Sequence, residues 1–269
     1  MNTSSKHIDF IINHTQKISD YYAQQKVSNR QFFALGLLQR LNHSCQSLKI
    51  LLKEMQKNPS VEFSIGLILR ALILDFLINL NLQKIIREGV EKKLSNDELE
   101  KIVDEYCNES LADGLKQVVS YIKSANSSQI LTEPQMKEMF NAIKNEYGEF
   151  FQEQRNKGDA PVVKHGKFPS ANELFTSIAK HKMFSNMAKI YDSYQFFSKY
   201  DHFGILYFHV IKTPFEDKMY QIANTIELLL GHLAYICHIL TTATPKDEFI
   251  KEQFHLSSEY LKTLKNEEN

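Results

Sequence analysis

Glycine and proline are scarce in this chain of 269 residues, which contains nine of the first and six of the second. The alternation of apolar and polar residues that is typical of half-buried strands is almost absent as well. Because glycine and proline punctuate helices, their scarcity and the missing alternation predict an all-α protein, a multi-helix bundle. No internal repeat and no convincing linker interrupts the sequence, so we expect a single domain over residues 1–269.

The chain also lacks an excess of either charge, since 32 basic and 32 acidic residues give a formal net charge of zero. A dedicated duplex-DNA binder usually carries a basic excess that neutralises phosphates, so this class of protein is disfavoured. Three widely spaced cysteines, Cys45, Cys107 and Cys237, form no CxxC pair and no His/Cys cluster. This pattern predicts reduced thiols in a cytoplasmic protein that has no zinc site and no other cofactor.

Helical periodicity and capping residues divide the chain into successive helices. We expect peripheral helices at residues 4–25 and 245–264, which flank the central part of the bundle. In a capping box, an N-cap side chain and a residue three positions later satisfy each other's backbone amides. The sequence predicts such boxes for Ser95 with Glu98, Thr132 with Gln135 and Ser170 with Glu173, and a further helix cap at Thr213.

Residues 61–82 are apolar on nearly every side of a predicted helix, yet they include Arg70, Asp75 and Asn79. A helix that is hydrophobic all round lies in a large helical core or in a membrane. A charged residue at a bilayer centre costs roughly 2.5–3.5 kcal/mol, which favours a core helix over a membrane span. Buried charges are destabilising unless they are paired, so we expect Arg70 and Asp75 to form a buried pair.

A second helix, predicted at residues 185–209, carries Tyr191, Ser198 and His202 within a narrow arc of one face. Tyrosine, serine and histidine make a poor packing surface and a good hydrogen-bonding surface. We therefore expect this helix and the Arg70 helix to form the two central antiparallel helices of the bundle.

These residues carry a resemblance to a known family. An arginine followed by an acid five residues later, as in Arg70 and Asp75, and a downstream Tyr-x6-Ser-x3-His, as in Tyr191, Ser198 and His202, resemble an uncharacterised all-helical bacterial family of unknown function. The resemblance covers roughly residues 30–240. That family is distantly similar to the HEPN helical superfamily, whose members are often metal-independent ribonucleases in toxin–antitoxin and phage-defence systems. The HEPN signature places arginine and histidine four to six residues apart on one helix, whereas Arg70 and His202 lie on different predicted helices.

The resemblance implies a HEPN-like, metal-independent ribonuclease or toxin that acts on RNA, and HEPN proteins often form homodimers. In such an enzyme His202 is the general acid or base, because the pKa of histidine lies near neutrality. Arg70 stabilises the developing charge on the phosphate. Asp75 orients His202 or Arg70, and Ser198 or Tyr191 positions the substrate. A second interpretation stays open, in which Arg70, Asp75, Ser198 and His202 form a buried structural network.

The least helical segment, residues 155–169, suggests an alternative function. It is either a solvated connection or a basic lid over an anionic ligand. In the second case the protein is a non-catalytic helical module that binds a protein partner or a small anion. The candidate binding residues in this segment are Arg155, Lys157, Lys164 and Lys167.

Overall fold

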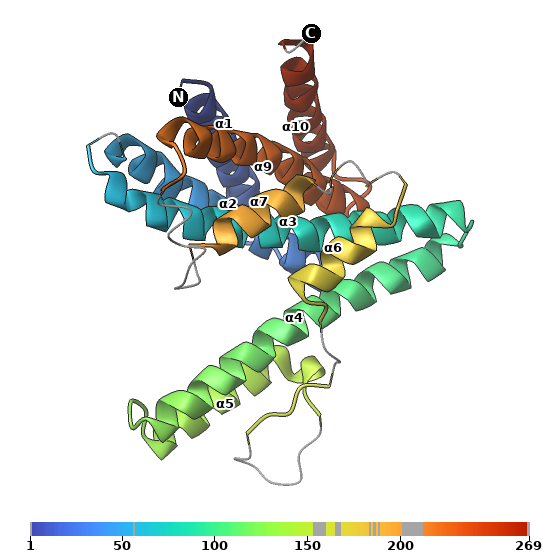
Figure 1. The fold of residues 1–269 in the computed structure, drawn as a ribbon. Coiled ribbons are helices and arrows are strands. Elements are labelled where there is room, and N and C mark those ends of the chain that lie inside the picture. The colour runs from blue at the N-terminus through green and yellow to red at the C-terminus, as the bar shows by residue number, and fades with distance from the viewer. Residues whose placement is uncertain are drawn as a thin grey trace. The chain divides into compact units, whose positions relative to one another are not determined.

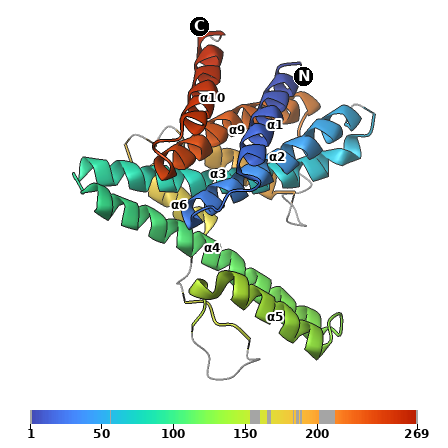
Figure 2. The same ribbon diagram turned by 180° about the vertical axis from the view of Figure 1, so that it is seen from behind.

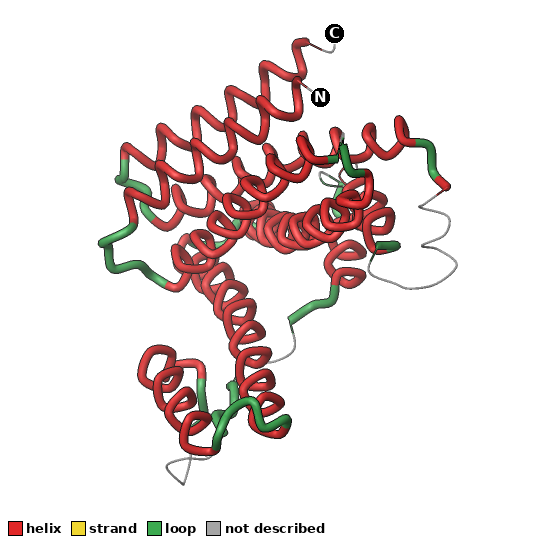
Figure 3. Tube along the Cα trace, turned by 90° about the vertical axis from the view of Figure 1, so that its left-hand side faces the viewer, coloured by secondary structure: helices red, strands yellow, loops and turns green. Residues whose placement is uncertain are grey.

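The computed structural model describes residues 2–55, 57–152, 160–164, 168–182, 184, 187, 189–200 and 212–267. Regular structure in this part of the chain is helical, which confirms the all-α prediction (Figure 3). One isolated antiparallel bridge joins Phe151 to Val163. The chain forms two compact units, Met1–Ser95 with Ser170–Asn269 (unit 1) and Asn96–Pro169 (unit 2). The single domain that the sequence predicts over residues 1–269 stays a prediction.

Unit 1 is built around α3 (Glu62–Glu91), which the one-turn helix η1 (Pro59–Val61) precedes. Four other helices of the unit pack against α3: α2 (Asn29–Glu54), α6 (Ala171–Ala179), α7 (Lys189–Ser198) and α9 (Phe215–Ala243) (Figure 1). Helix α3 is surrounded because apolar residues occupy most of its circumference, and Ile65, Leu69 and Leu80 are completely buried. Its polar residues therefore need partners on these neighbouring helices.

Two further helices of the described part of unit 1, α1 (Asn2–Tyr22) and α10 (Glu248–Glu267), pack against each other as well as against other helices (Figure 2). The ring of Phe10 stacks on Tyr260, with the ring centroids 3.9 Å apart. Near the other end of α1, Tyr21 donates a hydrogen bond of 2.8 Å to Asp247. The contact partner of Phe10 has a higher residue number than the partner of Tyr21, so α1 and α10 run in opposite directions.

Unit 2 consists of α4 (Asn96–Ser127), α5 (Glu133–Tyr147) and the short helix η2 (Gly148–Phe150). It has its own apolar cluster, in which Val119 and Ile122 of α4 pack with Phe140 and Phe151. Hydrogen bonds between Gln152 and Val162 and between Lys164 and Phe150 close the segment around the isolated bridge.

The helix starts agree with the sequence signals in two places and differ in a third. Two of the predicted capping boxes, Thr132 with Gln135 and Ser170 with Glu173, are present, and the box of Ser95 with Glu98 stays a prediction. The predicted cap at Thr213 is wrong, because Pro214 occupies the N-cap position of α9 and makes no side-chain cap hydrogen bond. Proline fits this place since it has no backbone amide to satisfy and its fixed φ suits the start of a helix.

Helix α9 is the one helix in the described ranges whose length and apolar composition are sufficient to cross a membrane. In its most apolar window, 56% of the residues are buried inside the protein. A core helix of a soluble protein has the same properties, so length and composition do not decide between the two.

Candidate functional site

Arg70 lies at the contact between α3 and α7, where two hydroxyl groups face its guanidinium. Its Nε donates to Ser198 Oγ over 3.4 Å, and its Nη2 donates to Tyr194 Oη over 3.5 Å. The guanidinium carbon also lies 5.5 Å from the centroid of the Tyr194 ring, a cation–π distance. All three side chains are partly exposed. We call Arg70, Tyr194 and Ser198 the Arg70 site.

Local geometry of α7 fixes the serine of this site. Ser198 ends α7, and its hydroxyl donates a hydrogen bond of 2.7 Å to the carbonyl of Tyr194, one turn earlier. With its proton engaged there, Ser198 Oγ presents lone pairs to Arg70. Arginine at such a partly exposed place can bind an anion bidentately, since its donors form a planar fork.

Asp75 does not take part in the Arg70 site, and the predicted ion pair between Arg70 and Asp75 is wrong. Asp75 is 3% exposed, and its Oδ2 pairs with Nε of Arg40 on α2 at 2.9 Å. Five residues along a helix correspond to a rotation of about 140°, so positions 70 and 75 face different neighbours. Arg40 was not assigned to this role from the sequence. The only available signal was its place on α2 beside the buried residue Leu41.

The carboxylate of Asp75 has an unusual environment. The contact with Arg40 is an ion pair without the alignment of a hydrogen bond, and Oδ2 has no hydrogen-bond partner among the described residues. Burial raises the pKa of Asp75 to about 6, although the positive charge of Arg40 acts in the opposite direction. Folding therefore removes the carboxylate of Asp75 from water, and the ion pair with Arg40 offsets only part of the free-energy cost of this desolvation.

A chain of buried polar groups continues from Asn79 of α3 to α9. The amide nitrogen of Asn79 donates to the carbonyl of His232 at 3.3 Å and lies 3.2 Å from its Nδ1. Burial lowers the pKa of His232 to about 3, so this ring is neutral at pH 7. The polar middle of α3 thus aligns α3 with α9, as structural polar networks do.

Tyr191 connects the Arg70 site to α6. Its ring stacks on Phe175 with centroids 4.0 Å apart and on Tyr194 at 5.8 Å, while its hydroxyl donates to Asn172 over 3.3 Å. A row of aromatic rings therefore leads from α6 across α7 to the guanidinium of Arg70. Such rows of aromatic rings with an adjacent arginine occur where proteins bind single-stranded nucleic acid.

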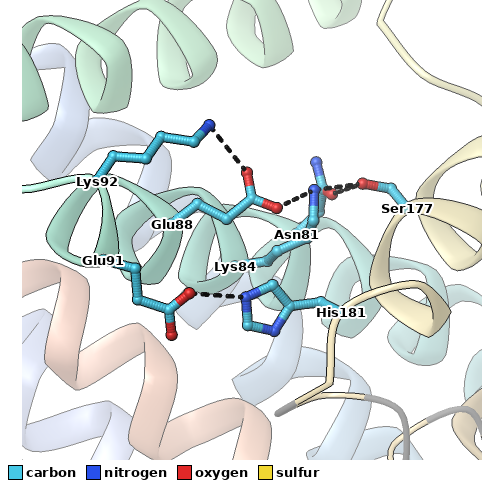
Figure 4. A network of polar contacts seen from close by, with 7 residues as sticks. All are labelled: Asn81, Lys84, Glu88, Glu91, Lys92, Ser177 and His181. Carbon is cyan, nitrogen blue, oxygen red and sulfur yellow. Dashed lines mark hydrogen bonds and ion pairs between the residues drawn. The ribbon is translucent and has the colours of Figure 1, made fainter.

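A polar groove of about 670 Å³ lies beyond this row, between α3 and α6. Lys84 is one of its lining residues, and in the polar network of Figure 4 its Nζ contacts Glu88 at 3.0 Å and donates to Ser177 over 2.9 Å. His181 faces Glu91 at 3.7 Å on the other side of the network. Cations and carboxylates alternate here, so the groove gives no clear preference for a charged ligand.

Four of the predicted site residues, His202, Arg155, Lys157 and Lys167, lie outside the described residues. Lys164 is described, and its Nζ donates to the carbonyl of Glu149 at 3.0 Å within unit 2. Within the described ranges no group of three or more histidine, cysteine or acidic residues is arranged to hold a metal ion. The structure thus brings together Arg70 and Ser198, with Tyr191 joined to them through Tyr194, and it places Asp75 with Arg40.

Comparison with protein-family models, with curated proteins and with solved structures finds no match to this chain. The residues of the site therefore carry the functional argument.

Proposed function

We propose that the protein is a HEPN-like ribonuclease or toxin that binds RNA at the Arg70 site, cleaves it without a metal ion, and acts in the bacterial cytoplasm in phage defence. The observation that supports this proposal most strongly is the partly exposed guanidinium of Arg70 beside two hydroxyl groups. A cation in this setting can neutralise a phosphodiester, and the aromatic row beside it offers rings for bases to stack on.

The proposed arrangement includes α3 and α7 as the two central antiparallel helices. Contacts between them support this part of the proposal, because Glu62 hydrogen-bonds to Tyr200 whereas Arg70, further along α3, reaches back to Ser198 and Tyr194. As residue numbers rise along α3, the residues of the α7 segment that contact it have falling numbers, which is the order expected for antiparallel helices.

In the proposed reaction the ribose 2′-hydroxyl attacks the adjacent phosphorus, and the bond from phosphorus to the 5′-oxygen breaks. His202, four residues after Ser198, accepts the proton of the 2′-hydroxyl as general base or donates a proton to the leaving 5′-oxygen as general acid, and water exchanges the other proton. Arg70 stabilises the negative charge that develops on the phosphate. Ser198 and Tyr194 hold the guanidinium, and Asp75 acts on the packing of α2 against α3 rather than on the substrate.

The test is cleavage of labelled total RNA and tRNA in EDTA by the wild type and three variants. We expect Arg70→Gln to lower the rate about 10²–10³-fold, as for a lost charge-stabilising group, and His202→Ala to lower it about 10²–10⁴-fold. Arg87→Gln is the matched control, since Arg87 is also on α3 but pairs with Glu91 on the same helix. Its rate should equal that of the wild type.

The same experiment distinguishes the proposed ribonuclease from the alternative function, which is a non-catalytic helical module that binds an anion or a protein partner. RNA that is retained by the wild type and released by Arg70→Gln, with no cleavage by either, would replace the enzyme with that module. Equal cleavage by the wild type and both site variants would place the activity elsewhere and refute the Arg70 site.

A further inference from the structure

A cavity of about 540 Å³ lies in unit 1 between α3, α9 and α10, apart from the Arg70 site. This volume is within the range of small-molecule sites in proteins. Most of its wall is apolar and includes the aromatic rings of Phe76, Tyr235 and Phe254. The cavity is partly open to solvent, so a ligand that covered its apolar wall would remove that surface from water.

One polar group in the wall has a defined hydrogen-bonding direction. Gln83 donates through Nε2 to the carbonyl of Tyr235 at 3.4 Å and to Asn79 Oδ1 at 3.5 Å, which turns its Oε1 to His238. His238 Nδ1 lies 2.8 Å from that oxygen. Because Oε1 can only accept, Nδ1 of His238 carries the proton and donates. The partners of Gln83 thus assign the tautomer of His238.

The second nitrogen of His238 therefore becomes an acceptor. Burial lowers the pKa of His238, so the ring is neutral near pH 7 and its Nε2 carries a lone pair. No residue in the described ranges forms a hydrogen bond with Nε2. This atom is also not one of the described side-chain nitrogen and oxygen atoms that are buried from solvent without a hydrogen-bond partner. It is thus available to a molecule in the cavity that His238 lines.

The charges of the wall are balanced. Glu227 and Lys262 are the charged residues of the wall in the described part of the chain, and their charges are opposite. The wall thus gives no net charge that would select an ionic ligand. Ser258 adds one hydroxyl on α10.

From these features we propose that the cavity binds an uncharged small molecule with an aromatic body and one hydroxyl group, which donates its hydrogen bond to His238 Nε2. The apolar wall accommodates the aromatic rings of the ligand, and His238 selects for a ligand that has a hydroxyl donor. A site that is built to accept a hydrogen bond discriminates against an analogue without the donor, because the buried acceptor then stays unpaired.

The test uses two fluorescent probes, 2-naphthol and its methyl ether 2-methoxynaphthalene, which differ in the single donor. Fluorescence anisotropy is titrated with the full chain in the absence of RNA, so the outcome is independent of the proposed nuclease. We expect saturable binding of 2-naphthol and about tenfold weaker binding of the ether, which corresponds to one hydrogen bond.

Three variants locate the binding. His238→Phe keeps a ring of similar size without the acceptor and should bind both probes with equal affinity. Gly231→Leu fills the cavity from α9, where a side chain would point towards Phe76, and should abolish binding of both probes. Leu256→Ala is the control on α10, because Leu256 is exposed and does not line the cavity, and it should bind as the wild type does.

The proposal is overturned if the wild type binds neither probe, binds both equally, or keeps its preference for 2-naphthol in His238→Phe. Undiminished binding by Gly231→Leu would also overturn it, since the probe would then occupy another site. If a variant does not fold, the comparison of the two probes on the wild type still decides.

Discussion

At the scale of single residues, Asp75 is a carboxylate whose environment in the folded protein differs strongly from water. Its carboxylate is almost fully buried and has one cation, Arg40, whose side chain is 60% exposed. Exposed cations stabilise a buried carboxylate only in part, because solvent screens them. The raised pKa of Asp75 is the sign of this imbalance.

The raised pKa makes folding stability depend on pH. Folded Asp75 keeps its proton up to about pH 6, whereas in the unfolded chain it loses the proton near the ordinary aspartate pKa of about 3.9. The folded state therefore binds more protons between these values, and the contribution of Asp75 to stability falls as the pH rises from about 4 to 6.

We expect Asp75→Asn to be more stable than the wild type at pH 7, by on the order of 2 kcal/mol, because the neutral amide does not need to be desolvated as an ion. At pH 4 the difference should be close to zero. Urea denaturation at the two pH values measures it. The interpretation fails if the difference between wild type and variant is the same at both pH values.

At the scale of elements, the contact of α3 with the end of α7 depends on a missing side chain. A Cβ on Gly66 of α3 would lie 2.7 Å from the ring of Tyr200, whereas the same atom on Gly36 of α2 would meet nothing within 4 Å. Tyr200 also hydrogen-bonds to Glu62, which in turn pairs with Lys218 of α9 at 3.0 Å. Gly66 thus permits the ring to approach the helix closely.

We expect Gly66→Ala to lower the free energy of unfolding by about 1–3 kcal/mol, as overpacking does, despite the better helix propensity of alanine. Gly36→Ala is the matched control in an exposed part of α2, and it should raise stability by up to about 1 kcal/mol. Thermal or urea unfolding compares the two. If both substitutions stabilise the protein, Tyr200 can move aside at little cost.

The sequence was a good guide to elements and a poorer guide to their pairing. Helical periodicity and the side chains of Thr132 and Ser170 act within one turn, so they are visible in a short stretch of sequence. The partner of Asp75 depends on which helix packs beside α3, and 35 positions separate Arg40 from Asp75 in the chain. Arg40 also looks like an ordinary surface residue, because most of its side chain is exposed.

At the scale of the whole molecule, the chain leaves unit 1 after α3 and returns to it at α6, with unit 2 inserted between. The apolar cluster of unit 2 consists of residues from that unit alone. Phe140, which is 1% exposed, is its largest fully buried side chain. Unit 2 therefore has a core of its own that can be weakened selectively.

Phe140→Ala should destabilise this core by about 3–5 kcal/mol. We expect faster hydrogen exchange of the backbone amides of α4 and α5, with exchange in α3 and α9 unchanged, and mass spectrometry of peptides measures both. An equal increase in all four helices would show that the two units unfold together, as a single cooperative domain requires.

The insertion also has a consequence during synthesis on the ribosome. Helix α3 emerges long before α9, since 123 residues separate Glu91 from Phe215. At about 5–20 residues per second, the ribosome needs roughly 6–25 seconds to add them. During this time α3 has no α9 to cover it, so apolar side chains of α3 are exposed in the nascent chain, and chaperones act on surface of this kind.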